Sequence, residues 1–263
     1  MSTTAGGSRV EIVSKLASQP FSREWFDLSR AEHFWFAWRL RAALALASDH
    51  GLPFGDELVA LDVGCGTGIL RLQLEAATAW RIDGADLDLD ALERNPAGRG
   101  SVFLYDVTEK RERFREAYDL ILMFDVLEHI APTAPFLEAV MCHLKPGGHL
   151  LLNVPALPSL FGRYDVAAGH HRRYARASLL AELTPLPLEP LETRYWGLSL
   201  IPLAAARKLL LGFGEEDEHT IGRGFEPPGR LIHAGLKGLM ALETGILRRP
   251  PLGASLLLLA RKR

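Results

Sequence analysis

Three glycines alternate with other residues in the segment Leu61–Gly68, where Gly64, Gly66 and Gly68 follow an apolar run. Glycine allows a sharp backbone turn and a close approach to a ligand, because it carries no Cβ atom. A helix that begins after such a turn offers unpaired N–H groups to a polar ligand. The dinucleotide fingerprint G-x-G-x-x-G would need its third glycine at position 69, which is Ile69. The spacing therefore predicts a ligand-binding turn and argues against a nicotinamide-dependent oxidoreductase.

Two carboxylates stand where the next two apolar runs end. Asp86 follows the first glycine by about twenty residues, the separation at which a carboxylate accepts ribose hydroxyls in nucleotide-binding folds. Asp106 ends the following run, Leu104-Tyr105-Asp106-Val107. The spacing of Asp86 favours a binding role over that of a solvated strand-end residue.

Three histidines lie where a side chain could remove a proton from a bound molecule. His129 follows the fourth apolar run, and His170 and His171 stand on a later loop that also carries arginines. Histidine is the natural general base near neutral pH. Asp125 and Glu128 are less favoured as bases; Glu128 is expected to orient a histidine or an arginine.

A regular alternation of strands and helices must position these residues. Short apolar runs predict buried parallel strands at Leu58–Val63, Arg81–Ala85, Val102–Tyr105, Leu120–Phe124 and Leu150–Val154. Helices are predicted between them at 69–78, 88–95, 109–116 and 133–144, then at 176–184. A further strand is expected near 188–195, and Leu252–Ala260 is expected to be the last strand. The alternation predicts an α/β fold with helices on both faces of a mostly parallel sheet.

The flanks of this core have a different character. The pattern from Arg9 to about His50 is helical, and residues 1–8 are expected to be disordered. The sequence thus predicts an N-terminal helical cap segment at 1–52, a core at 53–196, a helical insertion that caps the substrate at 197–250, and a final strand and tail at 251–263.

Over residues 58–154 the motifs resemble those of the class I methyltransferases that use S-adenosylmethionine (SAM). The carriers of this resemblance are the glycine turn, Asp86, Asp106, the segment Tyr118–Ile130 and the segment Leu144–Leu152. The resemblance implies a Rossmann-like sheet of seven strands whose last strand is antiparallel and pairs with the sixth. It also implies methyl transfer from SAM, with S-adenosylhomocysteine (SAH) as product.

Residue roles follow from this resemblance. Asp106 would meet the adenine amino group, and His129 or His170 would be the base, with His171 as a further candidate. The residues expected to bind the cofactor are Arg39, Asp62, Gly64, Cys65, Gly66, Gly68, Asp86, Leu87, Asp106, Val107, Phe124 and Asp125. No metal ligands are predicted, since the acids show no spacing typical of a hard-cation site.

Two further segments resemble a branch of bacterial methyltransferases, namely His33-Phe34-Trp35-Phe36 with Arg39, and Asp165–Tyr174. We expect Trp35 to line the cofactor mouth and touch the substrate, and Arg39 to clamp the methionine carboxylate as a fork. For the loop after the fifth strand two interpretations stand side by side. Its polar residues either bind the substrate or pair with their own acids, such as Asp165 and Glu128. The candidates for substrate binding are Arg172, Arg173 and Tyr174.

Composition limits the remaining classes of function. The formal net charge of -2 predicts no nucleic-acid partner, and two isolated cysteines favour a reducing cytoplasm. We therefore predict transfer of a methyl group to an oxygen or nitrogen of a small-molecule acceptor, with oxygen ahead. The alternatives are a lipid-linked acceptor with contact to a membrane surface, and a SAM-binding module without turnover.

Overall fold

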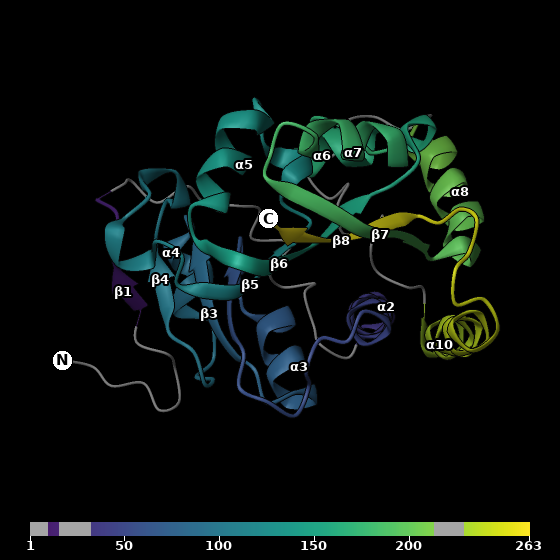
Figure 1. The fold of residues 1–263 in the computed structure, drawn as a ribbon. Coiled ribbons are helices and arrows are strands. Elements are labelled where there is room, and N and C mark those ends of the chain that lie inside the picture. The colour runs from purple at the N-terminus through teal and green to yellow at the C-terminus, as the bar shows by residue number, and fades with distance from the viewer. Residues whose placement is uncertain (1–9, 16–32, 213–228) are drawn as a thin grey trace.

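A mixed sheet of eight strands forms the centre of the computed structural model, which describes residues 10–15, 33–212 and 229–263 (Figure 1). The order across the sheet is β1-β4-β3-β2-β5-β6-β8-β7. The strands are β1 (Val10–Ile12), β2 (Val59–Val63), β3 (Arg81–Asp86), β4 (Val102–Leu104), β5 (Tyr118–Phe124), β6 (Leu144–Pro155), β7 (Leu188–Trp196) and β8 (Ser255–Lys262). Among the strands described, β8 alone runs against the others, between β6 and β7.

The predicted α/β class, the Rossmann-like order and the antiparallel last strand are confirmed. The strand count differs, because Val10–Ile12 adds an eighth strand that pairs in parallel with β4. The helical pattern predicted from Arg9 is therefore wrong at Val10–Ile12, where three residues carry too little periodicity to identify a strand. The expected disordered segment 1–8 lies outside the described residues.

Helices cover both faces of the sheet (Figure 1). They are α2 (Phe34–Asp49), α3 (Ile69–Ala77), α4 (Leu89–Glu93), α5 (Thr133–Met141), α6 (Arg163–Ala167), α7 (Arg176–Leu183), α8 (Ile201–Gly212) and α10 (Gly229–Ile246). Alternate residues of each strand face opposite sides, so Leu120 packs in the core under α2 and α3 while Ile121 packs in the core under α5 and α7. The helix predicted at 109–116 is wrong: Val107–Glu109 and Glu112–Phe114 are two short 3₁₀ turns.

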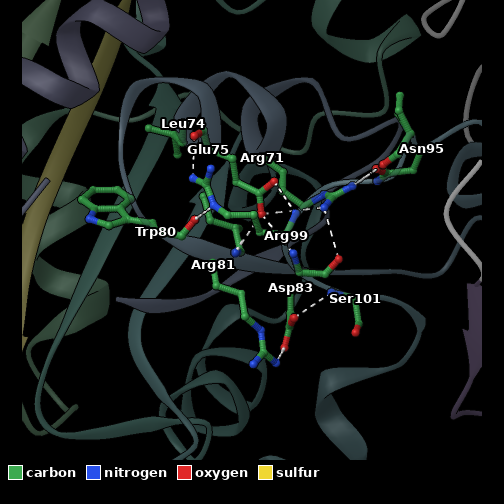
Figure 2. A network of polar contacts seen from close by, with 12 residues as sticks. Arg71, Leu74, Glu75, Trp80, Arg81, Asp83, Asn95, Arg99 and Ser101 are labelled. Atoms are coloured by element: carbon green, nitrogen blue, oxygen red, sulfur yellow. Dashed lines mark hydrogen bonds and ion pairs between the residues drawn. The ribbon is translucent and has the colours of Figure 1, made fainter. Parts of the chain in front are cut away.

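A buried network ties α3 to the strand that follows it (Figure 2). Arg71 of α3 is fully buried, and its Nη2 donates to Asn95 Oδ1 at 2.6 Å and to the Pro96 carbonyl at 2.5 Å. The carboxylate of Glu75, one turn later, accepts the backbone N–H of Ile82 at 3.0 Å. These bonds fix the helix behind the glycine turn to β3 and to the segment that follows α4.

We expect Arg71→Lys to lower the free energy of unfolding by about 2 kcal/mol, because an ammonium cannot reproduce the planar fork of bonds in a buried site. Urea denaturation followed by circular dichroism measures this. Arg115→Lys, at an exposed pair with Glu112, is the control and should leave stability nearly unchanged, because water and salt screen an exposed ion pair. An equal effect of both variants would contradict the assignment.

One carboxylate of α10 binds the backbone directly after β7. Glu243 of α10 is buried and accepts the N–H groups of Gly197, Leu198 and Ser199, each at 2.9 Å, and the Ser199 hydroxyl.

Leucines elsewhere on α8 and α10 remain exposed, Leu210 at 75% and Leu242 at 58%. Within the described ranges no helix combines the length and the apolar character needed to cross a membrane.

Candidate functional site

The predicted site residues gather at the carboxyl edge of the sheet. The order of the strands reverses between β2 and β5, since β3 lies on one side of β2 and β5 on the other. In open α/β sheets, ligands bind outside the carboxyl ends of the strands at such a switch point. The glycine turn follows β2, Asp86 ends β3, and Phe124 ends β5.

The glycine turn needs its glycines for conformational reasons. Gly64, Gly66 and Gly68 have φ values of 73°, 50° and 78°, in the left-handed region that side chains with a Cβ atom rarely adopt. At Gly68, a Cβ atom would also lie 2.2 Å from Asn95 Oδ1. Cys65 is buried within the turn, and burial raises the pKa of its thiol. The thiol therefore stays protonated and serves to pack the turn.

The Asp86 carboxylate binds backbone N–H groups of the glycine turn and of the residues that follow β3. Its Oδ2 accepts the Gly66 N–H at 2.8 Å, and its Oδ1 accepts the N–H groups of Leu87 at 2.7 Å and Asp88 at 2.9 Å. Burial raises the pKa of this carboxyl, and the three backbone donors partly offset the rise. A carboxylate has about four lone-pair positions, so Oδ2 keeps room for one hydroxyl of a ligand.

Asp62 is the second-last residue of β2. Its buried carboxyl has no hydrogen-bond partner among the described residues. Its side chain is 2% exposed. Burial raises the pKa of Asp62 to about 7, although the positive charges of Arg39 and Arg71 act in the opposite direction. A carboxyl in this state gains most from a positively charged group placed beside it.

Asp106 lies at the edge of the site and is directed toward its own turn. Its Oδ1 accepts the Thr108 N–H at 2.8 Å and the Thr108 hydroxyl at 2.6 Å. Its N–H donates to Ser14 Oγ at 2.9 Å, so the short β1 segment supports this turn. Val107 is buried beneath it.

A polar chain runs from α2 across the end of β5. Arg39 Nη1 pairs with Asp125 Oδ2 at 2.6 Å, and the Arg39 guanidinium lies 4.8 Å from the Trp35 ring centroid and 5.5 Å from that of Phe124. Asn153 of β6 donates to Asp125 Oδ1 at 2.7 Å. Arg39 Nε is buried with no hydrogen-bond partner among the described residues. The guanidinium thus has an unused donor in an aromatic surrounding.

Two of the three candidate histidines lie together, with an acid behind them. The ring centroids of His129 and His170 are 4.8 Å apart, edge to face. His129 Nδ1 is 3.2 Å from the Gly169 carbonyl, and His170 Nδ1 is 2.9 Å from Asp165 Oδ1. Burial, together with the neighbouring His170, lowers the pKa of His129 to about 4. His129 is therefore neutral at physiological pH.

Glu128 is the third member of this group. It is 1% exposed, and neither carboxylate oxygen has a hydrogen-bond partner among the described residues. Burial, and then the charge of Asp125, raises the pKa of Glu128 well above its ordinary value. Arg173, whose charge acts on Glu128, donates to Asp165 Oδ1 at 2.7 Å and to the Ala156 carbonyl at 3.2 Å.

The rest of this loop makes contacts within the protein. Arg172 pairs with Glu182 at 3.3 Å and donates to the Ile130 carbonyl at 3.1 Å. The buried Tyr174 hydroxyl is 3.4 Å from the Leu127 carbonyl and 3.3 Å from Glu182 Oε2. The backbone N–H of His171 donates to the backbone carbonyl of Glu128 at 2.8 Å, whereas the His171 side chain is exposed. Of the two interpretations of the loop, pairing with acids describes the contacts of Arg172 and Arg173 in this structure.

Sequence reasoning missed two asparagines that support the site. Asn153 also accepts the Trp196 indole N–H at 2.8 Å, and Asn95 Nδ2 donates to the Gly66 carbonyl at 3.2 Å. Both side chains are fully buried. A single amide inside the apolar run Leu150–Val154 was the available signal for Asn153, because an unpaired amide would be costly there.

The family comparison agrees with this arrangement. A family model described as a methyltransferase domain matches residues 21–188. This chain belongs to that methyltransferase family. The enzyme is thus a SAM-dependent methyltransferase, and SAM is its cofactor.

Among curated proteins, the methyltransferase is similar to a ubiquinone biosynthesis O-methyltransferase of Photobacterium profundum. The two are 28% identical over 187 residues, which cover 58% of this chain and 77% of the relative. Several relatives of the same name match over less than half of their own length.

Two solved structures support the fold. The [4+2]-cyclase SpnF has a TM-score of 0.54 and 22% identity, with 87% of this chain and 81% of that chain covered. A phosphoethanolamine N-methyltransferase 2 of Haemonchus contortus, in complex with SAM, has a TM-score of 0.52 and 18% identity, with 84% and 52% covered. One of these two is named as a cyclase, so the shared fold does not fix the reaction.

Proposed function

We propose that this methyltransferase moves the methyl group of SAM to an oxygen of a small-molecule acceptor, with nitrogen as the second choice. The observation that carries the proposal is the neutral His129 beside His170, in the segment that follows β5. A neutral imidazole can accept the proton that a hydroxyl must lose. The name of the Photobacterium relative, an O-methyltransferase, supports oxygen.

The cofactor fits the polar groups at the carboxyl edge of the sheet. Bound SAM supplies a methyl group that its sulfonium already activates. Asp86 would accept a ribose hydroxyl, and Asp106 with Val107 would meet the adenine. Arg39 would face the methionine carboxylate, because its Nε is a buried donor without a partner among the described residues. Asp62 would face the methionine ammonium.

The remaining work of the protein is alignment and proton removal. His129 or His170 takes the acceptor proton while the acceptor oxygen bonds to the methyl carbon and the carbon–sulfur bond breaks. Alignment of the reacting groups can contribute ~7–11 kcal/mol, and a general base typically adds ~10²–10⁴-fold. Arg172, Arg173 and Tyr174 would position the loop that carries His170, and residues 197–250 would cap the acceptor.

The experiment is incubation of the purified protein with methyl-labelled SAM and extract from source cells, fractionated into soluble and membrane material. Mass spectrometry then locates the label. An O-methylated small molecule in the soluble fraction is the expected result. Label confined to a lipid would move the assignment to a lipid-linked acceptor, which the exposed leucines of α8 and α10 would serve. Label on carbon would contradict the proposal.

A further inference from the structure

Three potential metal ligands converge behind the end of β5, although the sequence predicted none. Glu128, His129 and His170 each offer one ligand atom, and these atoms all lie within 4.8 Å of one another. The sequence pattern missed the cluster because His170 arrives from a loop far along the chain. The three residues also differ from the acid-rich spacing that is typical of a hard-cation site.

Glu128 is the strongest single sign of a missing partner. Buried polar groups are almost always hydrogen-bonded, yet both Glu128 oxygens lack a hydrogen bond within the described part of the chain. The nearby guanidinium of Arg173 is committed to Asp165 and Ala156. A cation between Glu128 and the two imidazoles would satisfy this carboxylate.

The two histidines already have the outer contacts of metal ligands. A metal-bound histidine almost always donates its other ring N–H to a carboxylate or a backbone carbonyl. His170 Nδ1 faces Asp165 Oδ1 at 2.9 Å, and His129 Nδ1 faces the Gly169 carbonyl at 3.2 Å. A carbonyl can only accept, so the hydrogen of His129 lies on Nδ1 and the lone pair on Nε2. The Asp165 carboxylate favours the same tautomer for His170.

We propose that Glu128, His129 and His170 bind one divalent transition-metal ion of the zinc, cobalt or manganese type. Two imidazoles with one carboxylate suit these ions, whereas magnesium and calcium prefer oxygen ligands throughout. Three protein ligands leave a position open, as in catalytic zinc sites. Tetrahedral bonds of ~2 Å place ligand atoms ~3.3 Å apart, so the cluster contracts when the ion binds.

This inference deepens the proposed function, on which its chemical meaning rests, by naming the acceptor class: molecules with a hydroxyl that can coordinate a metal. A metal-bound hydroxyl ionises more readily, and its proton passes to solvent. Its oxygen then bonds to the methyl carbon, the carbon–sulfur bond breaks, and the electron pair remains on the sulfur of SAH. With the ion bound, His129 and His170 are its ligands, so ionisation by the metal replaces proton removal by a histidine, while methyl transfer to oxygen stays as proposed.

The test is titration of the chelator-treated protein, without a histidine tag, with Co²⁺, followed by visible absorption and by calorimetry. We expect one Co²⁺ per chain, with absorption bands of low-symmetry coordination, and displacement by Zn²⁺ but not by millimolar Mg²⁺. Absence of saturable Co²⁺ binding by the wild-type protein would overturn the site. Equal competition by Mg²⁺ would overturn the assigned class of metal.

Variants locate the ion. Glu128→Gln and His170→Gln should each weaken Co²⁺ binding by at least 100-fold, and Asp165→Asn by ~10- to 100-fold through loss of the outer contact. His171→Gln, an exposed imidazole on the same loop, should leave Co²⁺ affinity unchanged. Unaltered binding in Glu128→Gln and His170→Gln would overturn the assignment. The affinity of each variant for SAH shows whether the variant is folded and still binds the cofactor. Methylation by a metal-free protein would overturn the catalytic role of the metal and leave the proposed methyl transfer unaffected.

Discussion

Replacement of Asp86 by asparagine is expected to raise the Kd for SAH about 100-fold. The Asp86 carboxylate accepts the Gly66 N–H at 2.8 Å and would accept a ribose hydroxyl on the same oxygen. An amide nitrogen at that position accepts neither and instead faces the Gly66 N–H with its own hydrogens. The lost hydrogen bond to the ribose is worth ~1.5–3 kcal/mol because the acceptor is charged, and the turn also loses the contact that holds Gly66 in its binding geometry. Together these give about two factors of ten in Kd.

Calorimetric titration with SAH measures this effect. Asp119→Asn is the matched control, because Asp119 stands near the other end of β5 and pairs with Lys145 at 2.7 Å. Its SAH affinity should equal that of the wild type. A Kd for Asp86→Asn within threefold of the wild-type value would show that Asp86 closes the turn without touching the ribose.

The parts of the fold that sequence predicted well are those set by local signals. The strand before Gly64, the turn itself and the helix from Ile69 follow from an apolar run, three glycines and a change of period. Val10–Ile12 escaped prediction because a three-residue strand has no period of its own and is defined by its pairing with β4. The helix expected at 109–116 failed because Asp106 and Arg111 begin two separate short turns there.

The candidate site likewise contains residues set by local sequence signals and residues set by tertiary contacts. Positions in the glycine turn and Asp86 could be placed from spacing alone, whereas the meeting of Glu128 with His170 depends on how a loop folds back after β6. Sequence could say that Arg173 had either a substrate or an acid as its partner. Only the tertiary structure brings it to within 2.7 Å of Asp165.

The second large effect concerns Asp62, where stability and cofactor binding should move in opposite directions. The pKa of Asp62 rises from 3.8 to about 7 in the folded protein, chiefly through burial. Between these values the unfolded chain loses its proton while the folded chain keeps it, so stability is lost as pH rises from about 4 to 7 and stays low above. Asp62→Asn removes this loss.

We therefore expect Asp62→Asn to raise the free energy of unfolding at pH 8 by ~2 kcal/mol, below the ~4 kcal/mol that the two pKa values set as a limit. At pH 4 the gain should vanish, and exposed Asp56→Asn should show no such trend. The same variant should bind SAH at least tenfold more weakly, because an amide offers no charge to the methionine ammonium. Binding by the wild type should then release a proton from Asp62 near pH 7, visible as a buffer-dependent calorimetric enthalpy that Asp62→Asn lacks. If the variant were more stable yet bound SAH normally, Asp62 would be a buried acid of the core and the ammonium would lie elsewhere.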